Sequence, residues 1–204
     1  MARIKAKRTN ATIDMTAMCD VSFLLLTFFI LTATARQPEP LPVDMPASTV
    51  QIPVPDSDIG TVTVGDGKVF FGVTGQQIRV EMLNRISEKY GVSFTEEEKQ
   101  RFSLIDGFGV PVERLKQLIA MNSSERLESD LQIGIPTDSA NNQLREWIYA
   151  ARYAAKDVNN VDLRISIKGD AQEEYPSVKR VIDILQDQDV NKFSLITNLR
   201  GEDY

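Results

Sequence analysis

The chain has 204 residues, the length of one full-sized domain with additional segments. Apolar residues make up 42% of the chain and charged residues 25%, a balance typical of proteins that bury a core. There is no histidine and a single cysteine, Cys19, which excludes Ser/His/Asp and Cys/His nucleophilic sites, histidine-bearing zinc sites and an internal disulfide. The net charge of -6 argues against binding to DNA or RNA, because that binding uses a basic surface to neutralise phosphates.

The first 35 residues are basic overall, whereas the rest of the chain is acidic. Basic side chains at positions 3, 5, 7 and 8 precede an uncharged apolar run from Val21 to Ala35. Extended back to Met15, this run gives a helix of about 31 Å, enough to cross the roughly 30 Å of bilayer hydrocarbon. We predict a transmembrane helix over residues 15–35 and a cytoplasmic segment over residues 1–14, because basic flanks stay in the cytoplasm.

A second interpretation of the same run is a cleaved signal peptide. The basic start, the apolar stretch and Ala33-Thr34-Ala35 together match the signal-peptide pattern, and residues 1–35 would then be removed from a secreted periplasmic binding module. Against this, twenty residues that include Asp14 and Asp20 precede the run, whereas an ordinary signal peptide begins with a short basic segment. Both interpretations stay open at this point.

Asp20 lies inside the predicted membrane helix, where an ionised carboxylate costs several kcal/mol. One interpretation makes it the N-cap of a shorter helix, at the level of the lipid headgroups. The other makes it an ion or proton carrier, since acids within a membrane usually face a bundle interior or a wet cavity. Thr16, Thr27 and Thr34 fall on the same helical stripe and are the candidate pore-facing polar residues.

Residues 36–58 contain six of the nine prolines and are predicted to form an extended, semi-rigid linker. The remaining residues, 59–204, are predicted to form a small α/β (α+β) domain. We expect a hairpin from Thr61–Val64 and Lys68–Phe71, a strand over residues 163–167 and a last strand over residues 193–199. Helices are expected over residues 77–90, after Thr95 in a capping box, over residues 112–121, from a cap at Thr137 or Asp138 to Lys156, and from Pro176.

The domain carries little sign of reaction chemistry. The acidic clusters at residues 96–98 and 173–174 lie at expected helix starts, which favours capping over metal binding. The segment 107–109 lacks the pattern of a nucleotide loop and is expected to be a turn. Trp147, Tyr149 and Tyr153 are expected in the core. We therefore predict a binding or scaffolding module that is not an enzyme, with no metal and no cofactor.

The sequence resembles the ExbD/TolR family of bacterial proton-driven motors, most specifically near the N-terminus. The family pattern is Thr-Pro-x-x-Asp before a leucine-rich run, and here it reads Thr16-Ala-Met-Cys-Asp20-Val-Ser-Phe-Leu24, with Ala17 in place of the proline. The segment 43–49 is similar to the family's linker motif, with Pro46, Ala47 and Ser48 at its centre. The resemblance covers residues 10–78 and 161–199, so residues 79–160 are interpreted as a helical insertion.

The resemblance implies a single-pass protein of the bacterial inner membrane, with its N-terminus in the cytoplasm and its domain in the periplasm. Two copies of the helix would sit inside a ring of ExbB-like or TolQ-like subunits, and Asp20 would carry protons and energise TonB-dependent outer-membrane transport through a TonB-like protein. An alternative is a TolR-like or motility-type motor subunit that binds the cell wall, with peptidoglycan as its partner. The energy source would be the proton gradient.

Overall fold

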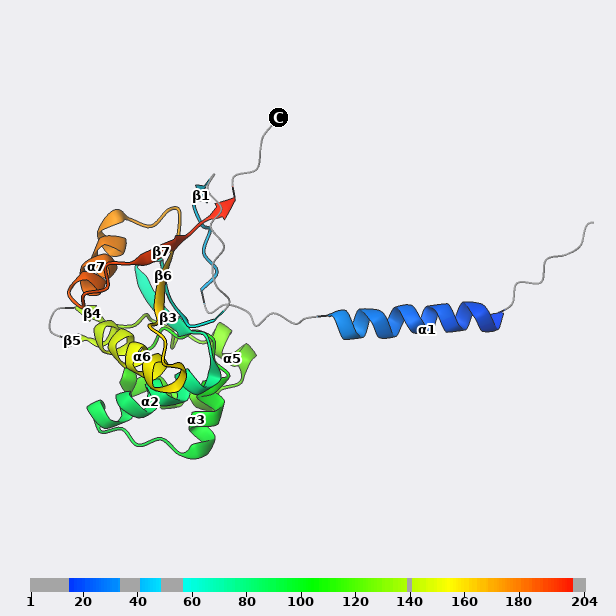
Figure 1. Cartoon of the computed structure of the whole chain (residues 1–204), viewed down its shortest axis with the longest axis horizontal. Helices are drawn as coiled ribbons and strands as arrows, with labels where there is room; N and C mark the ends of the chain where they lie inside the picture. Colours follow the sequence, from blue (N-terminus) through cyan, green and yellow to red (C-terminus); the bar gives the residue numbers. More distant parts are fainter. Residues whose placement is uncertain (1–14, 34–40, 49–56, 139–140, 200–204) are drawn as a thin grey trace, which may run out of the picture. The chain divides into compact units, whose positions relative to one another are not determined.

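The computed structural model describes residues 15–33, 41–48, 57–138 and 141–199. The chain divides into two units, Met1–Gln37 and Pro38–Tyr204. The predicted cytoplasmic segment 1–14, Thr34 and much of the predicted linker lie outside the described residues. A single apolar helix is followed by a mixed α+β domain, as the sequence predicts (Figure 1).

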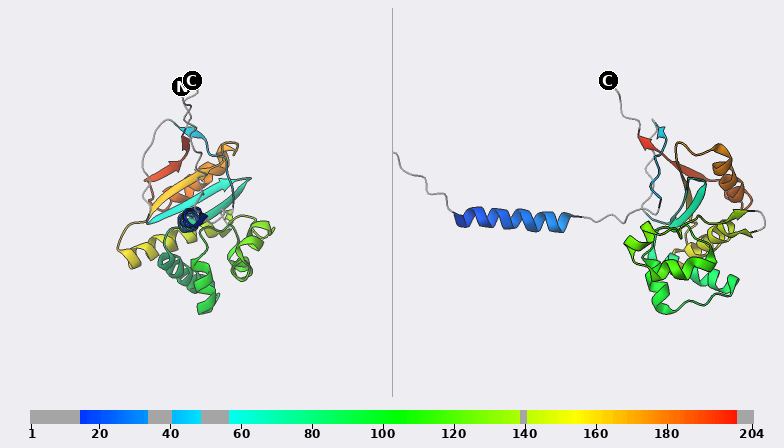
Figure 2. Two further views of the ribbon diagram at one scale, coloured as in Figure 1. Left: turned by 90° about the vertical axis from the view of Figure 1, so that its right-hand side faces the viewer. Right: turned by 180° about the vertical axis from the view of Figure 1, so that it is seen from behind.

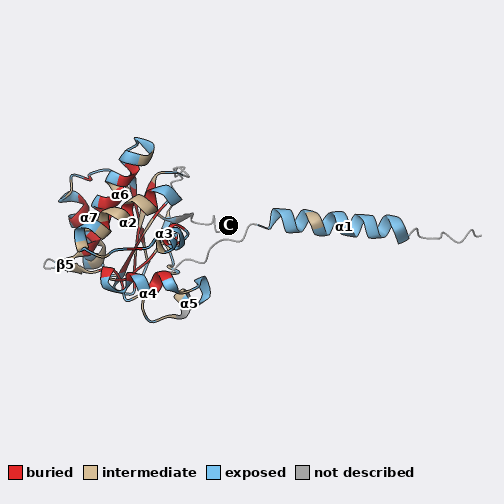
Figure 3. Ribbon diagram, turned by 90° about the horizontal axis from the view of Figure 1, so that it is seen from below, coloured by how far each residue is buried: buried red, intermediate tan, exposed pale blue. Residues whose placement is uncertain are grey.

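The first unit contains helix α1, Met15–Thr32. Its eighteen residues rise about 27 Å, close to the thickness of bilayer hydrocarbon. None of these residues is buried among the described residues, and the large side chains are exposed all round; Phe23 and Leu31, for example, are 64% and 85% exposed. Figure 3 shows this contrast with the domain, whose helices carry buried inner faces. By length and composition α1 can cross a membrane.

The domain is built on a four-stranded sheet. Strands β2 (Ile59–Gly65) and β3 (Lys68–Val73) form the predicted antiparallel hairpin, with Asp66 and Gly67 at its turn, both at positive φ. Strand β6 (Arg164–Gly169) pairs parallel with β2, and β7 (Phe193–Ile196) pairs parallel with β6, which gives the order β3-β2-β6-β7. The predicted last strand therefore ends as two pieces, β7 and β8 (Asn198–Leu199).

One face of the sheet carries the core. Paired residues share a face, so Val62 and Val64 of β2 lie beside Ile165 and Ile167 of β6, and all four are almost fully buried. Helices α6 (Gln143–Asn159) and α7 (Tyr175–Gln186) lie on the same side of the sheet (Figures 1 and 2). The opposite face carries Thr61 and Thr63 of β2 and also Phe70 of β3, which pairs with Thr63 and is buried.

Residues 76–159 form the helical part of the domain. Their helices are α2 (Gln76–Tyr90), α3 (Glu96–Ser103), the short 3-10 helix η1 (Val112–Arg114), α4 (Leu115–Ala120), α5 (Ser123–Glu128), and α6. The capping box at α3 is present: the Thr95 hydroxyl accepts from the Glu98 amide, and the Glu98 carboxylate accepts from the Thr95 amide. Pro176 lies in the first turn of α7, as predicted, and Pro111 directly precedes η1.

This helical part belongs to the same core as the sheet and seals one of its edges. Phe71 of β3 and Phe108 exchange two backbone hydrogen bonds of 2.9 and 3.0 Å, and the Ile135 amide donates to the Val69 carbonyl at 2.7 Å. Phe102 and Phe108 pack against Trp147, with ring centroids 6.2 and 4.7 Å from the indole. The expectation of a simple turn at residues 107–109 is therefore wrong, since Phe108 pairs with β3.

Two further local expectations are wrong. Thr137 and Asp138 form strand β4, which pairs with β5 (Asn141–Asn142), and α6 is capped instead by the Asn142 side chain, which accepts from the Arg145 amide at 3.0 Å. Tyr149 and Tyr153 are not in the core: they are 50% and 45% exposed, whereas Trp147 is fully buried. Because two helical steps turn about 200°, residue 149 faces away from residue 147.

Candidate functional site

The candidate site of the first unit is the polar stripe of α1. Asp20 is the sixth residue of the helix, about 7.5 Å along the axis from Met15. Thr16 precedes Asp20 by four residues and Thr27 follows it by seven, so all three lie within about 40° of one helix face. The structure thus brings three of the predicted site residues onto one stripe, while Thr34 lies outside the described residues.

The hydroxyl groups of Ser22, Thr27 and Thr32 in α1 donate to carbonyl groups of the helix itself. The Thr27 hydroxyl donates to the Leu24 carbonyl at 2.9 Å, and Ser22 and Thr32 donate in the same way to Met18 and Phe28 at 2.8 and 2.7 Å. Such bonds let short polar side chains sit in an apolar helix at little cost.

Asp20 differs from these hydroxyl residues because a carboxylate has no donor to offer while it is ionised. Its side chain is exposed, and no hydrogen bond or ion pair to it is found among the described residues. Within the described part of the chain, the Asp20 carboxylate therefore has no group that compensates its charge.

The linker motif lies in the second unit. Ala47 and Ser48 form strand β1, which pairs parallel with β8, and Pro46 directly precedes it. This pairing ties the motif to the C-terminal strand of the domain. The sequence offered no signal for it, because the paired residues are about 150 positions apart.

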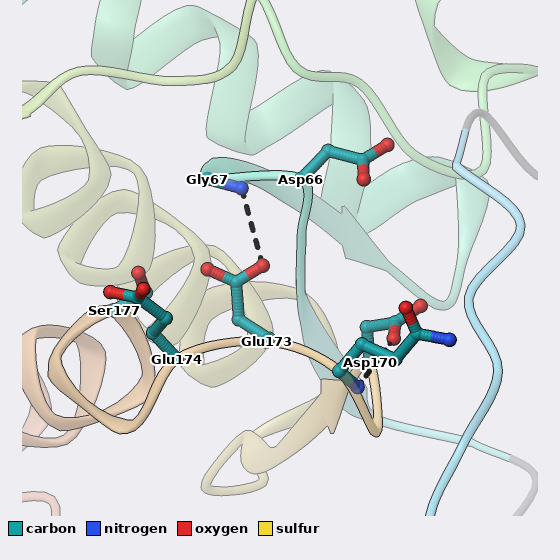
Figure 4. A pocket seen from close by; sticks show the side chains of 7 residues that line it. Asp66, Gly67, Asp170, Glu173, Glu174 and Ser177 are labelled. Atoms are coloured by element: carbon teal, nitrogen blue, oxygen red, sulfur yellow. Dashed lines mark hydrogen bonds between the residues drawn. The ribbon is translucent and has the colours of Figure 1, made fainter.

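An acidic hollow opens at one end of the sheet, between the β2–β3 turn and the start of α7. Figure 4 shows its lining, which includes Asp66, Asp170, Glu173 and Glu174. The Glu173 carboxylate accepts from the Gly67 amide at 3.2 Å, and the two oxygens of Asp170 accept from the Gln172 and Asp44 amides at 2.8 and 3.1 Å. Two of these carboxylates therefore hold neighbouring loops together, and no metal-binding group of three or more ligands is found among the described residues.

The same end of the domain contains a contact that the sequence analysis did not predict. Asp44 and Asp170 are 126 positions apart, yet they join the linker to the loop after β6. Gly65 lies beside them at the end of β2, against Leu41 and Val43.

The protein-family model for the biopolymer transport protein ExbD/TolR matches residues 6–199. The chain belongs to the ExbD/TolR family. The match includes residues 79–160, which the sequence analysis interprets as an insertion. No curated protein and no solved structure matches the chain.

Family membership indicates the general class of protein to which α1 and the domain belong. ExbD/TolR proteins are non-enzymatic subunits of transport linked to the proton motive force, need no cofactor, and generally work with ExbB/TolQ and with TonB-like or Pal-like partners. Together with the one apolar helix near the N-terminus, membership indicates a single-pass membrane protein.

Proposed function

We propose that this chain is the ExbD-like subunit of a proton-driven motor in the bacterial inner membrane, and that Asp20 carries the protons. The observation that carries this proposal is a single carboxylate on a stripe of an otherwise uncharged helix that buries none of its residues among the described residues. An ionised carboxylate is costly in hydrocarbon, so a protein keeps one there for a function. The polar stripe at Thr16 and Thr27 supplies a face that a wet pathway can follow.

The membrane potential can drive the proposed proton transfer at Asp20. A charge that crosses the full membrane potential gains about 2.3 kcal/mol per 100 mV. In the proposed cycle, Asp20 takes up a proton, crosses an apolar environment in its neutral form, and releases the proton against a wet or polar partner. Two such helices inside a ring of ExbB-like or TolQ-like subunits would convert these steps into rotation.

The orientation follows from charge. Basic residues precede α1 and the following domain is acidic, which favours an N-terminus in the cytoplasm and a domain in the periplasm. We place the cytoplasmic segment at residues 1–14, the membrane segment at 15–35, the linker at 36–58 and the periplasmic domain at 59–204. The domain and linker would pass the motion to a TonB-like protein that opens outer-membrane transporters.

The decisive experiment is Asp20→Asn in the full-length chain, expressed with its ring partner. We expect energised uptake to fall to the background level, because the amide cannot exchange a proton, while expression and copurification of the ring stay normal. Asp20→Glu should retain part of the activity. Asp183→Asn, which removes one exposed carboxylate of the domain, is the matched control and should be active. Normal uptake by Asp20→Asn would overturn the proposal.

The signal-peptide alternative is tested on the mature protein. We expect mass spectrometry of the N-terminus to find residues 1–35 still attached. A mature chain that begins at Arg36 would instead support a secreted binding module.

The TolR-like alternative shares the family and the proton step but differs in the partner of the domain. Purified full-length protein that sediments with isolated peptidoglycan, and that does not copurify with a TonB-like protein, would favour wall anchoring over transporter coupling.

A further inference from the structure

The neighbours of Asp20 on its own helix face differ between its two sides. In an α-helix, the residues three and four positions away lie on the same face, within about 60° of the starting residue. On the N-terminal side of Asp20 these residues are Thr16 and Ala17. On the C-terminal side they are Phe23 and Leu24. The N-terminal side is therefore polar or small, whereas the C-terminal side is large and apolar.

The apolar side lies between Asp20 and the next polar residue of the stripe. Thr27 is about 10.5 Å from Asp20 along the helix axis. Phe23 and Leu24 occupy the turn between them, one on each flank of the stripe, and are 64% and 58% exposed. Helical side chains lean towards the N-terminus of their helix, so Phe23 and Leu24 extend over the turn that carries Asp20.

The hydroxyl of Thr27 does not shorten this apolar stretch. It donates its proton to the Leu24 carbonyl at 2.9 Å, which leaves the oxygen free only to accept from water. Hydrogen-bonded oxygens lie about 2.8 Å apart, so a chain of about three water molecules is needed to join Thr27 to Asp20. Apolar walls expel such a chain by dewetting. On the other side, Thr16 is only about 6 Å from Asp20 along the axis, a span for a single water.

We propose that Phe23 and Leu24 form a gate that keeps water and protons on the C-terminal side of α1 away from Asp20. A carrier that is wet from both sides at once lets protons cross without doing work, so one side has to be closed. With the gate closed, Asp20 exchanges protons past Thr16 and Ala17, on the cytoplasmic side. The inference rests on the proton step and the orientation of the proposed function, and it names the side chains that prevent a leak.

The gate is tested first without proton transfer, by the reactivity of a thiol at position 20. In a Cys19→Ser background, Asp20→Cys is expressed with its ring partner and treated from the periplasm with a membrane-impermeant methanethiosulfonate reagent. We expect slow labelling while Leu24 is present. Leu24→Thr should speed it roughly tenfold, because the added hydroxyl lets water enter the turn and ionise the thiol. Thr27→Cys in the same background should be labelled rapidly.

Leu25→Thr is the matched control for Leu24→Thr. It adds the same hydroxyl one residue further on, about 140° around the helix from Asp20, and should leave labelling slow. Phe23→Thr opens the other flank of the stripe and serves as a second variant if Leu24→Thr does not copurify with the ring. Fast labelling of Asp20→Cys with Leu24 in place would overturn the gate, as would equal rates in Leu24→Thr and Leu25→Thr.

Proton leak is the second measurement. The full-length chain and its ring partner are placed in vesicles that contain pyranine, and the decay of an imposed pH gradient is followed. We expect Leu24→Thr to speed the decay roughly fivefold or more. Adding Asp20→Asn should restore the slow rate, because the leak passes through the carboxylate. A leak that persists in this double variant would overturn the gate.

The two proposals fail in different ways. Slow labelling of Asp20→Cys in Leu24→Thr, combined with loss of uptake in Asp20→Asn, would contradict the gate alone. Fast labelling that depends on Leu24→Thr, combined with normal uptake in Asp20→Asn, would contradict the proton proposal and leave the closure of this turn to water in place.

Discussion

Helices α1 and α6 are nearly equal in length, with eighteen and seventeen residues, but they obtain their stability from opposite sources. Helix α6 turns eight side chains into the core, which include Trp147, Ile148 and four alanines, and shows Tyr149 and Tyr153 on its outer face. Helix α1 buries none of its side chains among the described residues. Helix α6 is therefore stabilised by packing in the core of the domain. The apolar side chains of α1 need an apolar environment that the described residues do not provide.

The largest effect that separates the two helices is expected at Trp147. Trp147→Ala should lower the free energy of unfolding of the domain by about 3–5 kcal/mol, because it leaves a cavity against Phe102 and Phe108. Urea unfolding of the full-length protein, followed by circular dichroism, measures this loss. Trp147→Phe should cost much less, since it keeps an aromatic ring and removes an indole N–H that has no hydrogen-bond partner among the described residues. Equal losses in the two variants would contradict a packing role.

A smaller effect is expected at Tyr90, at the end of α2 beside α6. Burial raises the pKa of Tyr90 above its ordinary value, and the charges of Glu146 and Glu113 add to the increase. The folded protein thus holds this proton more tightly than the unfolded chain. The stabilisation is complete below the unfolded pKa of about 10 and is lost as the pH rises through the higher folded pKa.

The measurement is the free energy of unfolding between pH 9 and the alkaline limit of folding. We expect the wild-type protein to lose stability with pH more steeply than Tyr90→Phe, with no difference between them near neutral pH. Parallel pH profiles of the two proteins would contradict the burial of Tyr90 between α2 and α6 as the cause of a raised pKa.

The smallest effect is expected in α1 itself. Phe29 is 64% exposed, so Phe29→Ala should leave the free energy of unfolding of the domain unchanged within about 0.5 kcal/mol. The same urea measurement checks this value, and fractionation into membranes checks that the variant still inserts. A large loss of domain stability would show that α1 packs on the domain and would break the comparison.

Much of the architecture could be predicted from the sequence because its signals are local. The apolar run of α1, the Asp66-Gly67 turn, the capping box at Thr95 and the proline at the start of α7 each act within a few residues. The same holds for the stripe of Thr16, Asp20 and Thr27, since helical periodicity fixes which residues share a face.

The failures have two physical causes. Tyr149 lies two positions from Trp147 and therefore faces the other side of the helix, so the two residues cannot share the core. The other misses come from contacts between distant residues: Phe108 is held by strand β3, Thr137 by strand β5, and Asp44 by Asp170. Tertiary pairing of this kind overrides local preference and leaves no periodic trace in the sequence.

The backbone pairing of β3 with Phe108 and Ile135 limits where a further strand can pair with the sheet. The backbone groups of Val69 and Phe71 on the outer side of β3 already bond to Ile135 and Phe108. At the far side, β7 has only β6 as a partner among the described strands, with Leu195 62% exposed. Among the described strands, β7 is therefore the edge that offers unpaired backbone groups to a further strand.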